Sequence, residues 1–143
     1  MGSGKADSPD VADPRAQVVT EQAPQPTGRY SQGIIAAGRF VFVSGQVPRD
    51  PASGKPLDGP MGAQVRLTLA NLRAVLEAAG ANLSSIVMLR VYLRDLGNRR
   101  IVDDLLSEMV PSPWPARTTV GVDLGQFEVE LDAIAVVSAS QNI

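Results

Sequence analysis

Residues 115–137 read PARTTVGVDLGQFEVELDAIAVV. Two stretches rich in small and β-branched residues, which favour strands, flank a short polar loop, so the segment predicts a β-hairpin. The first strand carries Arg117, and the second carries Glu130 and Asp132 among apolar neighbours. Charged side chains in so apolar a segment indicate either a solvated sheet surface or a buried site for a small charged molecule.

Other apolar runs predict further strands. Residues 39–44, RFVFVS, and residues 85–94, SIVMLRVYLR, are typical of strands. Residues 29–36 alternate weakly and predict another strand, with Gly38 as the tight turn of a second hairpin. The pair of valines that begins at Val18 predicts a short edge strand.

Two segments have the apolar spacing of amphipathic helices. The first begins near Pro60 and ends at Gly80, and its apolar face is formed by Met61, Val65, Leu69, Leu72, Leu76 and Ala79. The second covers about residues 98–110, with an inward face of Ile101, Val102, Leu105, Leu106 and Met109. Arg99 and Arg100 stand at its start, where the helix dipole disfavours cations, so they have another role or extend into water.

The order strand, strand, helix, strand, helix, strand, strand predicts an α/β (α+β) domain. We expect one mixed sheet with both helices on one face. The other face is then too apolar for water, with candidates Phe40 or Phe42, Val87 or Val91, and Ile134 or Val136. Such a face implies a partner, most simply another copy of the chain, and repeated use of the face closes a ring with active sites between subunits.

Composition limits the possible functions. The chain has 143 residues, which suits one domain, and its net charge of -2 argues against a basic nucleic-acid or membrane-surface binder. It contains no cysteine and no histidine, so thiolate nucleophiles, disulfides and the commonest metal ligands are excluded. Any catalysis must therefore use carboxylates, Arg, Lys, Tyr, hydroxyl groups, backbone groups or water. We expect no metal and no cofactor.

The N-terminal segment predicts a tail. Residues 1–16 are rich in Gly, Ser, Asp and Pro and have no hydrophobic stretch typical of a secretory signal, so we expect a flexible tail before a domain at residues 17–143. No segment is long and apolar enough to span a bilayer. The lack of cysteine fits a cytoplasmic protein.

Six blocks of sequence occur together in one order. They are GRYSQGI (28–34), FVFVSGQVPRDPASG (40–54), AQVRLTLANLRAVLEAAG (63–80), VYLRDL (91–96), PAR (115–117) and VELDAIA (129–135). Together they resemble the RidA/YjgF family of reactive-intermediate deaminases, also called endoribonuclease L-PSP. The resemblance implies a chorismate-mutase-like subunit in a homotrimer, with the sheets facing inward and clefts between subunits. It also implies a hydrolase of C=N bonds that converts 2-imino and enamine acids, such as 2-aminoacrylate or 2-iminobutyrate, to 2-keto acids and ammonia.

The same resemblance implies roles for individual residues. Arg117 binds the substrate carboxylate, for which a guanidinium offers matching planar donors. Glu130 positions or deprotonates the attacking water. Tyr30 and Ser44 are also expected at the cleft, and Gly45 shapes the turn beside it. Thr119 follows Arg117 by two residues, so a regular strand points it to the same side of the site. From the residues alone, Arg117 could equally be a structural arginine paired with Glu130 or Asp132.

The chain also departs from the family pattern. Arg29 stands where relatives commonly have proline, the loop at residues 123–127 is shorter than in typical members, and Asp103 stands where many relatives carry asparagine. The first two changes border the expected pocket and bear on substrate range. Two other functions stay open: a non-catalytic protein that binds a small carboxylate or keto acid through Arg117, and an RNA-cleaving protein that uses the basic cluster of Arg90, Arg94, Arg99 and Arg100.

Overall fold

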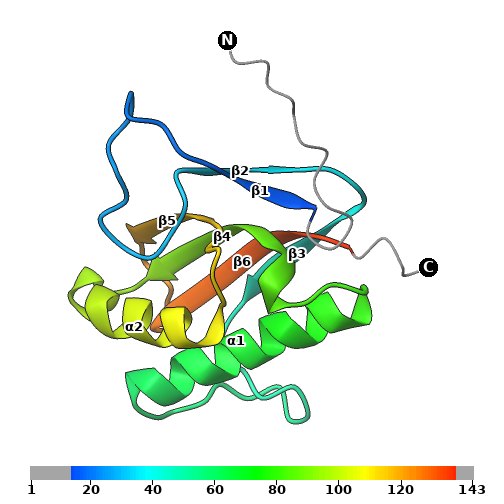
Figure 1. Cartoon of the computed structure of the whole chain (residues 1–143). Helices are drawn as coiled ribbons and strands as arrows, with labels where there is room; N and C mark the ends of the chain where they lie inside the picture. Colours follow the sequence, from blue (N-terminus) through cyan, green and yellow to red (C-terminus); the bar gives the residue numbers. More distant parts are fainter. Residues whose placement is uncertain (1–13, 138–143) are drawn as a thin grey trace.

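The computed structural model describes residues 14–137 (Figure 1). In chain order its elements are β1 Arg15–Val18, β2 Gly33–Ala36, β3 Phe40–Gln46, α1 Met61–Ala78, β4 Ile86–Leu93, α2 Arg99–Met109, β5 Ala116–Gly121 and β6 Val129–Val136. Short 3₁₀ turns precede β4 and α2. Most of the predicted tail at residues 1–16 falls in 1–13, outside the described residues, whereas Arg15 and Ala16 belong to β1.

The main sheet has four strands in the order β3-β6-β4-β5. β4 runs parallel to β5 and antiparallel to β6, so the predicted mixed sheet is confirmed. The predicted hairpin at residues 115–137 is wrong, because β4 lies between β5 and β6. The crossover through α2 returns the chain along one edge of β4, and the loop after β5 then carries it to the other edge, so both edges of β4 are hydrogen-bonded.

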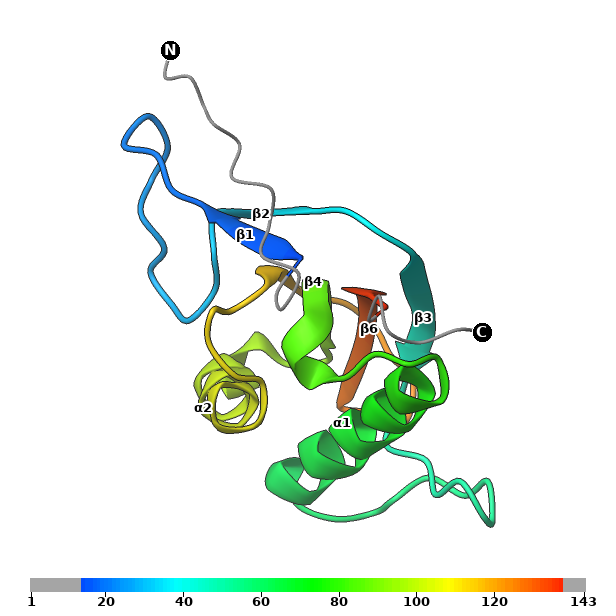
Figure 2. The ribbon, with the colours of Figure 1, turned by 45° about the vertical axis from the view of Figure 1, so that its right-hand side comes forward.

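β1 and β2 form a separate two-stranded antiparallel sheet. Figures 1 and 2 show this pair on the side of the main sheet that faces away from the helices. The hairpin predicted around Gly38 is therefore wrong: Gly38, at a φ of 125°, lies where the chain passes from one sheet to the other. Phe40 pairs with Val136 of β6. The Arg15 guanidinium donates to the carbonyl of Ile86 at 2.8 Å, which ties β1 to the start of β4.

Both helices cover the other face of the main sheet (Figure 2). The apolar face predicted for α1 is confirmed, because its four central members are completely buried: Val65, Leu69, Leu72 and Leu76. α2 buries Val102, Leu105 and Leu106. Ile101 was predicted to point inward but is 49% exposed, because it lies about 100° around the helix from Val102 and off the buried stripe. Within residues 14–137, neither helix is long and apolar enough to cross a membrane.

The sheet face away from the helices carries a partly exposed apolar row. Phe42, Ile134 and Met88 lie side by side on β3, β6 and β4, and Phe42 is 72% exposed. Val91 and Val136, which were candidates for this face, are buried. We call Phe42, Ile134 and Met88 the apolar row. An aromatic side chain this exposed favours a surface that another molecule covers.

Candidate functional site

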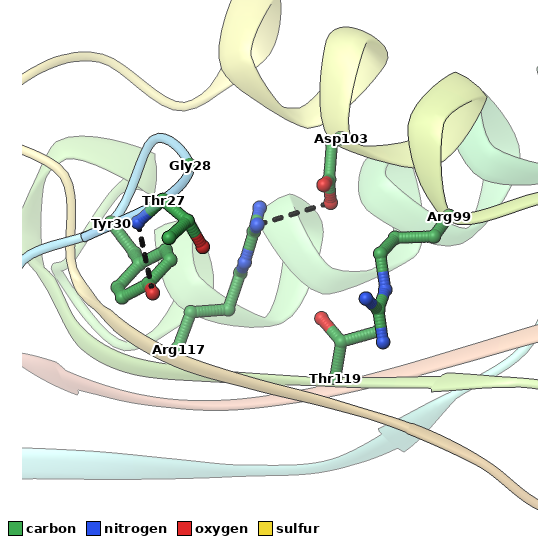
Figure 3. Close-up of a pocket in the computed structure, with 7 residues that line it drawn as sticks. All are labelled: Thr27, Gly28, Tyr30, Arg99, Asp103, Arg117 and Thr119. Atoms are coloured by element: carbon green, nitrogen blue, oxygen red, sulfur yellow. Dashed lines mark hydrogen bonds and ion pairs between the residues drawn. The ribbon is translucent and has the colours of Figure 1, made fainter. Parts of the chain in front are cut away.

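A pocket of about 310 Å³ lies beside β5, an edge strand of the main sheet. Its walls come from the loop before β2, from the first turns of α2 and from β5 itself (Figure 3). The lining residues are Thr27, Gly28, Tyr30, Arg99, Asp103, Arg117 and Thr119. Since no lining side chain is an aliphatic hydrocarbon, the pocket suits a polar or charged ligand.

The loop before β2 is fastened to the start of β5 through Ser31. The Ser31 amide donates to the carbonyl of Pro115 at 3.0 Å, and its hydroxyl donates to the carbonyl of Trp114. Ser31 also forms a parallel bridge with Ala116 and is buried. These bonds hold the loop against the edge of the sheet, so Tyr30 lies next to Arg117.

Arg117 occupies the centre of the pocket. It pairs with Leu89 in the sheet, so its side chain leaves β5 on the helix side, and only 8% of that side chain is exposed. One guanidinium nitrogen, Nη2, lies 3.0 Å from Oδ1 of Asp103 on α2 (Figure 3). The guanidinium carbon lies 5.7 Å from the centre of the Tyr30 ring, within reach of a cation–π interaction. The ion pair and the ring restrain the guanidinium of a residue that lines the cavity.

Thr119 lines the same pocket. It pairs with buried Val91 as Arg117 pairs with buried Leu89. Both side chains therefore leave β5 on one side, as we expect for residues two apart in a regular strand.

Tyr30 presents its ring to Arg117 and its phenol oxygen to Thr27. The Thr27 amide donates to this oxygen at 3.3 Å. Hydrogen bonding from the side chain of Thr27, then from its backbone, and the charge of Arg117 together lower the pKa of the Tyr30 phenol. A phenol with a lowered pKa is a stronger acid, so Tyr30 is a better hydrogen-bond donor to an anionic ligand.

Glu130 lies on the other face of the sheet. It pairs with Tyr92 on β4, whereas Arg117 pairs with Leu89, three residues earlier on the same strand. Side chains alternate between faces along a strand, so Glu130 and Arg117 point in opposite directions. Within one chain the two residues that sequence reasoning placed together are separated by the sheet.

Gly45 stands directly against Glu130. A Cβ atom at position 45 would lie 2.2 Å from Oε2 of Glu130, so only glycine leaves the carboxylate where it is. Ser44 is exposed and follows Val43, which faces the helices, in the part of β3 where the register shifts. Ser44 directly precedes Gly45 at this irregularity. Ser44, Gly45 and Glu130 thus form a second group, distinct from the pocket.

The alternative in which Arg117 is paired with Glu130 or Asp132 does not hold within the chain. Arg117 pairs with Asp103 rather than with Glu130 or Asp132. Asp132 lies on the face away from the helices, where it accepts hydrogen bonds from Arg90 Nε at 2.7 Å and from the Tyr92 hydroxyl at 2.9 Å. The hydrogen bond to Asp132 is the largest cause of the raised pKa of Tyr92. Strand alternation separates Asp132 from Arg117, as it separates Glu130.

The predicted basic cluster is divided among several surroundings. Arg90 is paired on the face away from the helices, and Arg94 lies 3.4 Å from a carboxylate oxygen of Glu128. Arg99 lines the pocket on the helix side. Arg100 is exposed and is not among the pocket residues.

Sequence reasoning missed part of the pocket, namely Thr27, Gly28, Arg99 and Asp103. One signal for two of them was present. Asp103 follows Arg99 by one helical turn, so both lie on one side of α2, and Arg99 occupies a position that the helix dipole disfavours. The contact between this side of α2 and β5 could not be predicted from the sequence.

A family model described as Endoribonuclease L-PSP matches residues 20–137. The chain belongs to this family, RidA/YjgF. The match spans both groups of candidate residues, from Tyr30 in the loop before β2 to Glu130 in β6.

Individual RidA/YjgF relatives align over most of their length. A RutC family protein of Pyrococcus abyssi is 40% identical over 120 residues, covering 82% of this chain and 94% of that protein. A 2-iminobutanoate/2-iminopropanoate deaminase of Dermatophagoides farinae is 34% identical over 126 residues, covering 87% of this chain and 98% of that protein. Among solved structures, the Rid family protein YyfB from Yersinia pestis has a TM-score of 0.76 at 27% identity, covering 87% of this chain and 99% of YyfB.

Proposed function

We propose that this RidA/YjgF protein hydrolyses reactive 2-imino and enamine acids to 2-keto acids and ammonia, in clefts between the subunits of a homotrimer. The observation that carries the proposal is Arg117, whose almost buried side chain lines a pocket of about 310 Å³. Relatives named as 2-iminobutanoate/2-iminopropanoate deaminases, at 34% and 33% identity, support the reaction class. A cytoplasmic location, expected from the lack of cysteine, stays a prediction.

Arg117 anchors the substrate. Its guanidinium offers paired donors in one plane, which match a carboxylate, and burial strengthens such charge-assisted hydrogen bonds. The Tyr30 phenol and the Thr119 hydroxyl add polar contacts beside it. Binding at this point fixes the orientation of the C=N carbon, which is next to the carboxylate in a 2-imino acid.

Glu130 acts on the substrate held by a neighbouring subunit. Each chain carries a partly exposed apolar row and the group of Ser44, Gly45 and Glu130 on the same sheet face, whereas its pocket lies beside the edge strand β5. A contact that covers the row and reaches β5 of the neighbouring chain brings Glu130 towards that chain's pocket. A trimer closes this contact around a threefold axis. Opposite placement of Arg117 and Glu130 within one chain supports a cleft built from two chains.

The chemistry needs only a held carboxylate, a placed water and proton transfer. Glu130 accepts a proton as water adds to the carbon of the protonated imine, which gives a tetrahedral carbinolamine. Transfer of a proton to nitrogen releases ammonia, and the carbon–oxygen bond becomes the carbonyl of the 2-keto acid. An enamine first gains a proton at its β-carbon and becomes the imine. No redox partner is required.

Arg117→Ala is expected to lower kcat/KM for ammonia release from freshly generated 2-iminobutanoate by roughly 10²–10³-fold, because it removes a buried charged anchor. It also leaves the Asp103 carboxylate in the pocket without its cation, so an anionic substrate is repelled. Arg94→Ala, which removes an exposed arginine outside the pocket, serves as the matched control. Near-normal activity of Arg117→Ala, with an unchanged melting temperature, would contradict the proposal.

Gly45→Ala tests the placement of Glu130 without changing its chemistry. The added methyl group occupies the position of the carboxylate oxygen, so the flexible end of Glu130 must move, and we expect turnover to fall about 10- to 100-fold. Thermal unfolding should change little. The control is Gly59→Ala, whose methyl group meets nothing closer than Leu57 Cγ at 3.9 Å. Equal turnover in the two variants would mean that the position of Glu130 does not matter for the reaction.

The second candidate is a non-catalytic protein that binds small carboxylates or keto acids. One observation favours it: a single chain holds Arg117 in a pocket, whereas Glu130 lies on the opposite sheet face. RNA cleavage, which the family description suggests, has weaker support. Its four candidate arginines do not share one surface, and the net charge of the chain is -2.

A further inference from the structure

Arg99 is an exposed cation, and its own helix does not explain its position. It is the first residue of α2, and the first turn of this helix contains no acid. Among residues 14–137, no carboxylate forms an ion pair with Arg99. A cation at a helix N-terminus is disfavoured by the helix dipole, and Arg99 also shares a pocket with a second cation, Arg117. A ligand that brings negative charge would relieve both effects.

The charges in the pocket are not equivalent. Arg117 is paired with Asp103 at 3.0 Å, and its remaining donors are assigned above to the substrate carboxylate. Arg99 reaches from α2 towards β5 on the other side of Asp103 (Figure 3). A substrate with only one carboxylate, bound at Arg117, leaves the guanidinium of Arg99 without an anion.

The remaining lining also disfavours an alkyl substrate. Thr27, Thr119 and Asp103 contribute polar atoms, Gly28 has no side chain, and the ring of Tyr30 is stacked towards Arg117. An alkyl side chain on the substrate would gain little apolar contact within this chain, whereas an acidic side chain would meet Arg99 and a threonine hydroxyl.

We propose that Arg99 is a specificity-determining residue that binds a second acidic group of the substrate, so that the preferred substrates are 2-imino acids with an acidic side chain. This inference rests on the proposed deaminase function and names its substrate class. Such a substrate is supplied by a reaction that converts the α-amino group of an acidic amino acid to an imine, for example by oxidation.

A binding experiment tests the inference without turnover. The probes are 2-oxoglutarate and 2-oxopentanoate, which have the same number of carbons and differ in the terminal carboxylate. Calorimetric titration of the wild-type protein should give about tenfold tighter binding of 2-oxoglutarate, as a charge-assisted hydrogen bond predicts. Arg99→Ala should remove this ratio, and the neighbouring control Arg100→Ala should keep it. A wild-type preference for 2-oxopentanoate, or a ratio unchanged in Arg99→Ala, overturns the inference.

A kinetic experiment separates this inference from the proposed function. An amino-acid oxidase with catalase generates 2-iminoglutarate from glutamate and 2-iminopentanoate from norvaline, and ammonia release is followed with and without the protein. We expect kcat/KM to favour 2-iminoglutarate in the wild type and in Arg100→Ala, and to lose that preference in Arg99→Ala. Acceleration of both imines without the preference overturns only the role of Arg99. Acceleration of neither imine, nor of 2-iminobutanoate, overturns the deaminase function itself.

Discussion

Glu130→Gln is expected to lower kcat for ammonia release from 2-iminobutanoate by about 10²–10⁴-fold, the range for loss of a general base. Glutamine has nearly the volume of glutamate and can still hydrogen-bond a water molecule, but it cannot accept the proton. Affinity for the product 2-oxobutanoate should stay within about twofold, because its carboxylate is held by Arg117 and not by Glu130. The measurement is a pair of numbers: kcat from ammonia release and Kd from calorimetry.

The control for this substitution is Glu128→Gln. Glu128 lies two residues before Glu130 and forms an ion pair with Arg94 that is partly exposed, so its loss should change neither number appreciably. A parallel loss of turnover and affinity in Glu130→Gln would favour a binding protein, as would the absence of turnover in the wild type. A large fall in turnover at constant affinity separates the enzyme from the binder.

Mixing two inactive variants is expected to restore activity. Arg117→Ala keeps Glu130, and Glu130→Gln keeps Arg117, so a cleft between one chain of each kind can contain both intact residues. After subunits of equal amounts have exchanged at random, about a quarter of the interfaces should be intact, and activity should rise from background to about a quarter of the wild-type value. The measurement is ammonia release before and after exchange under mild denaturant.

The control mixture contains Arg117→Ala and the double variant Arg117→Ala/Glu130→Gln, in which no interface can recover. Native mass spectrometry of chains of different mass verifies the exchange and the number of subunits. If exchange is complete and the first mixture stays inactive, Arg117 and Glu130 do not act together across two chains. If the assembly is a dimer or a monomer, the homotrimer is wrong.

The helices could be predicted from the sequence because each is specified by local spacing. Leu69, Leu72 and Leu76 define a stripe that any apolar surface can cover, so the pattern does not depend on what lies opposite. Strand pairing is different. The turn at Gly38 and the loop before Phe127 both read as hairpin connections, yet β3 and β5 pair with strands distant in sequence, a choice that local residue preferences do not determine.

The candidate site could be predicted only in part for the same reason. Strand alternation correctly placed Thr119 beside Arg117. It could also have separated Glu130 from Arg117, but only once β4 was known to lie between their strands. Asp103 faces Arg117 because α2 packs over β5, and no local signal in the sequence specifies that contact.

The opposed directions of Arg117 and Glu130 have a consequence for inheritance. If every cleft takes Arg117 from one chain and Glu130 from the adjoining chain, a chain that lacks both residues inactivates the clefts on its two sides. A cell with one intact and one doubly defective gene copy would then keep well below half of its capacity. Selection on this protein would therefore act on the whole assembly as well as on the individual chain.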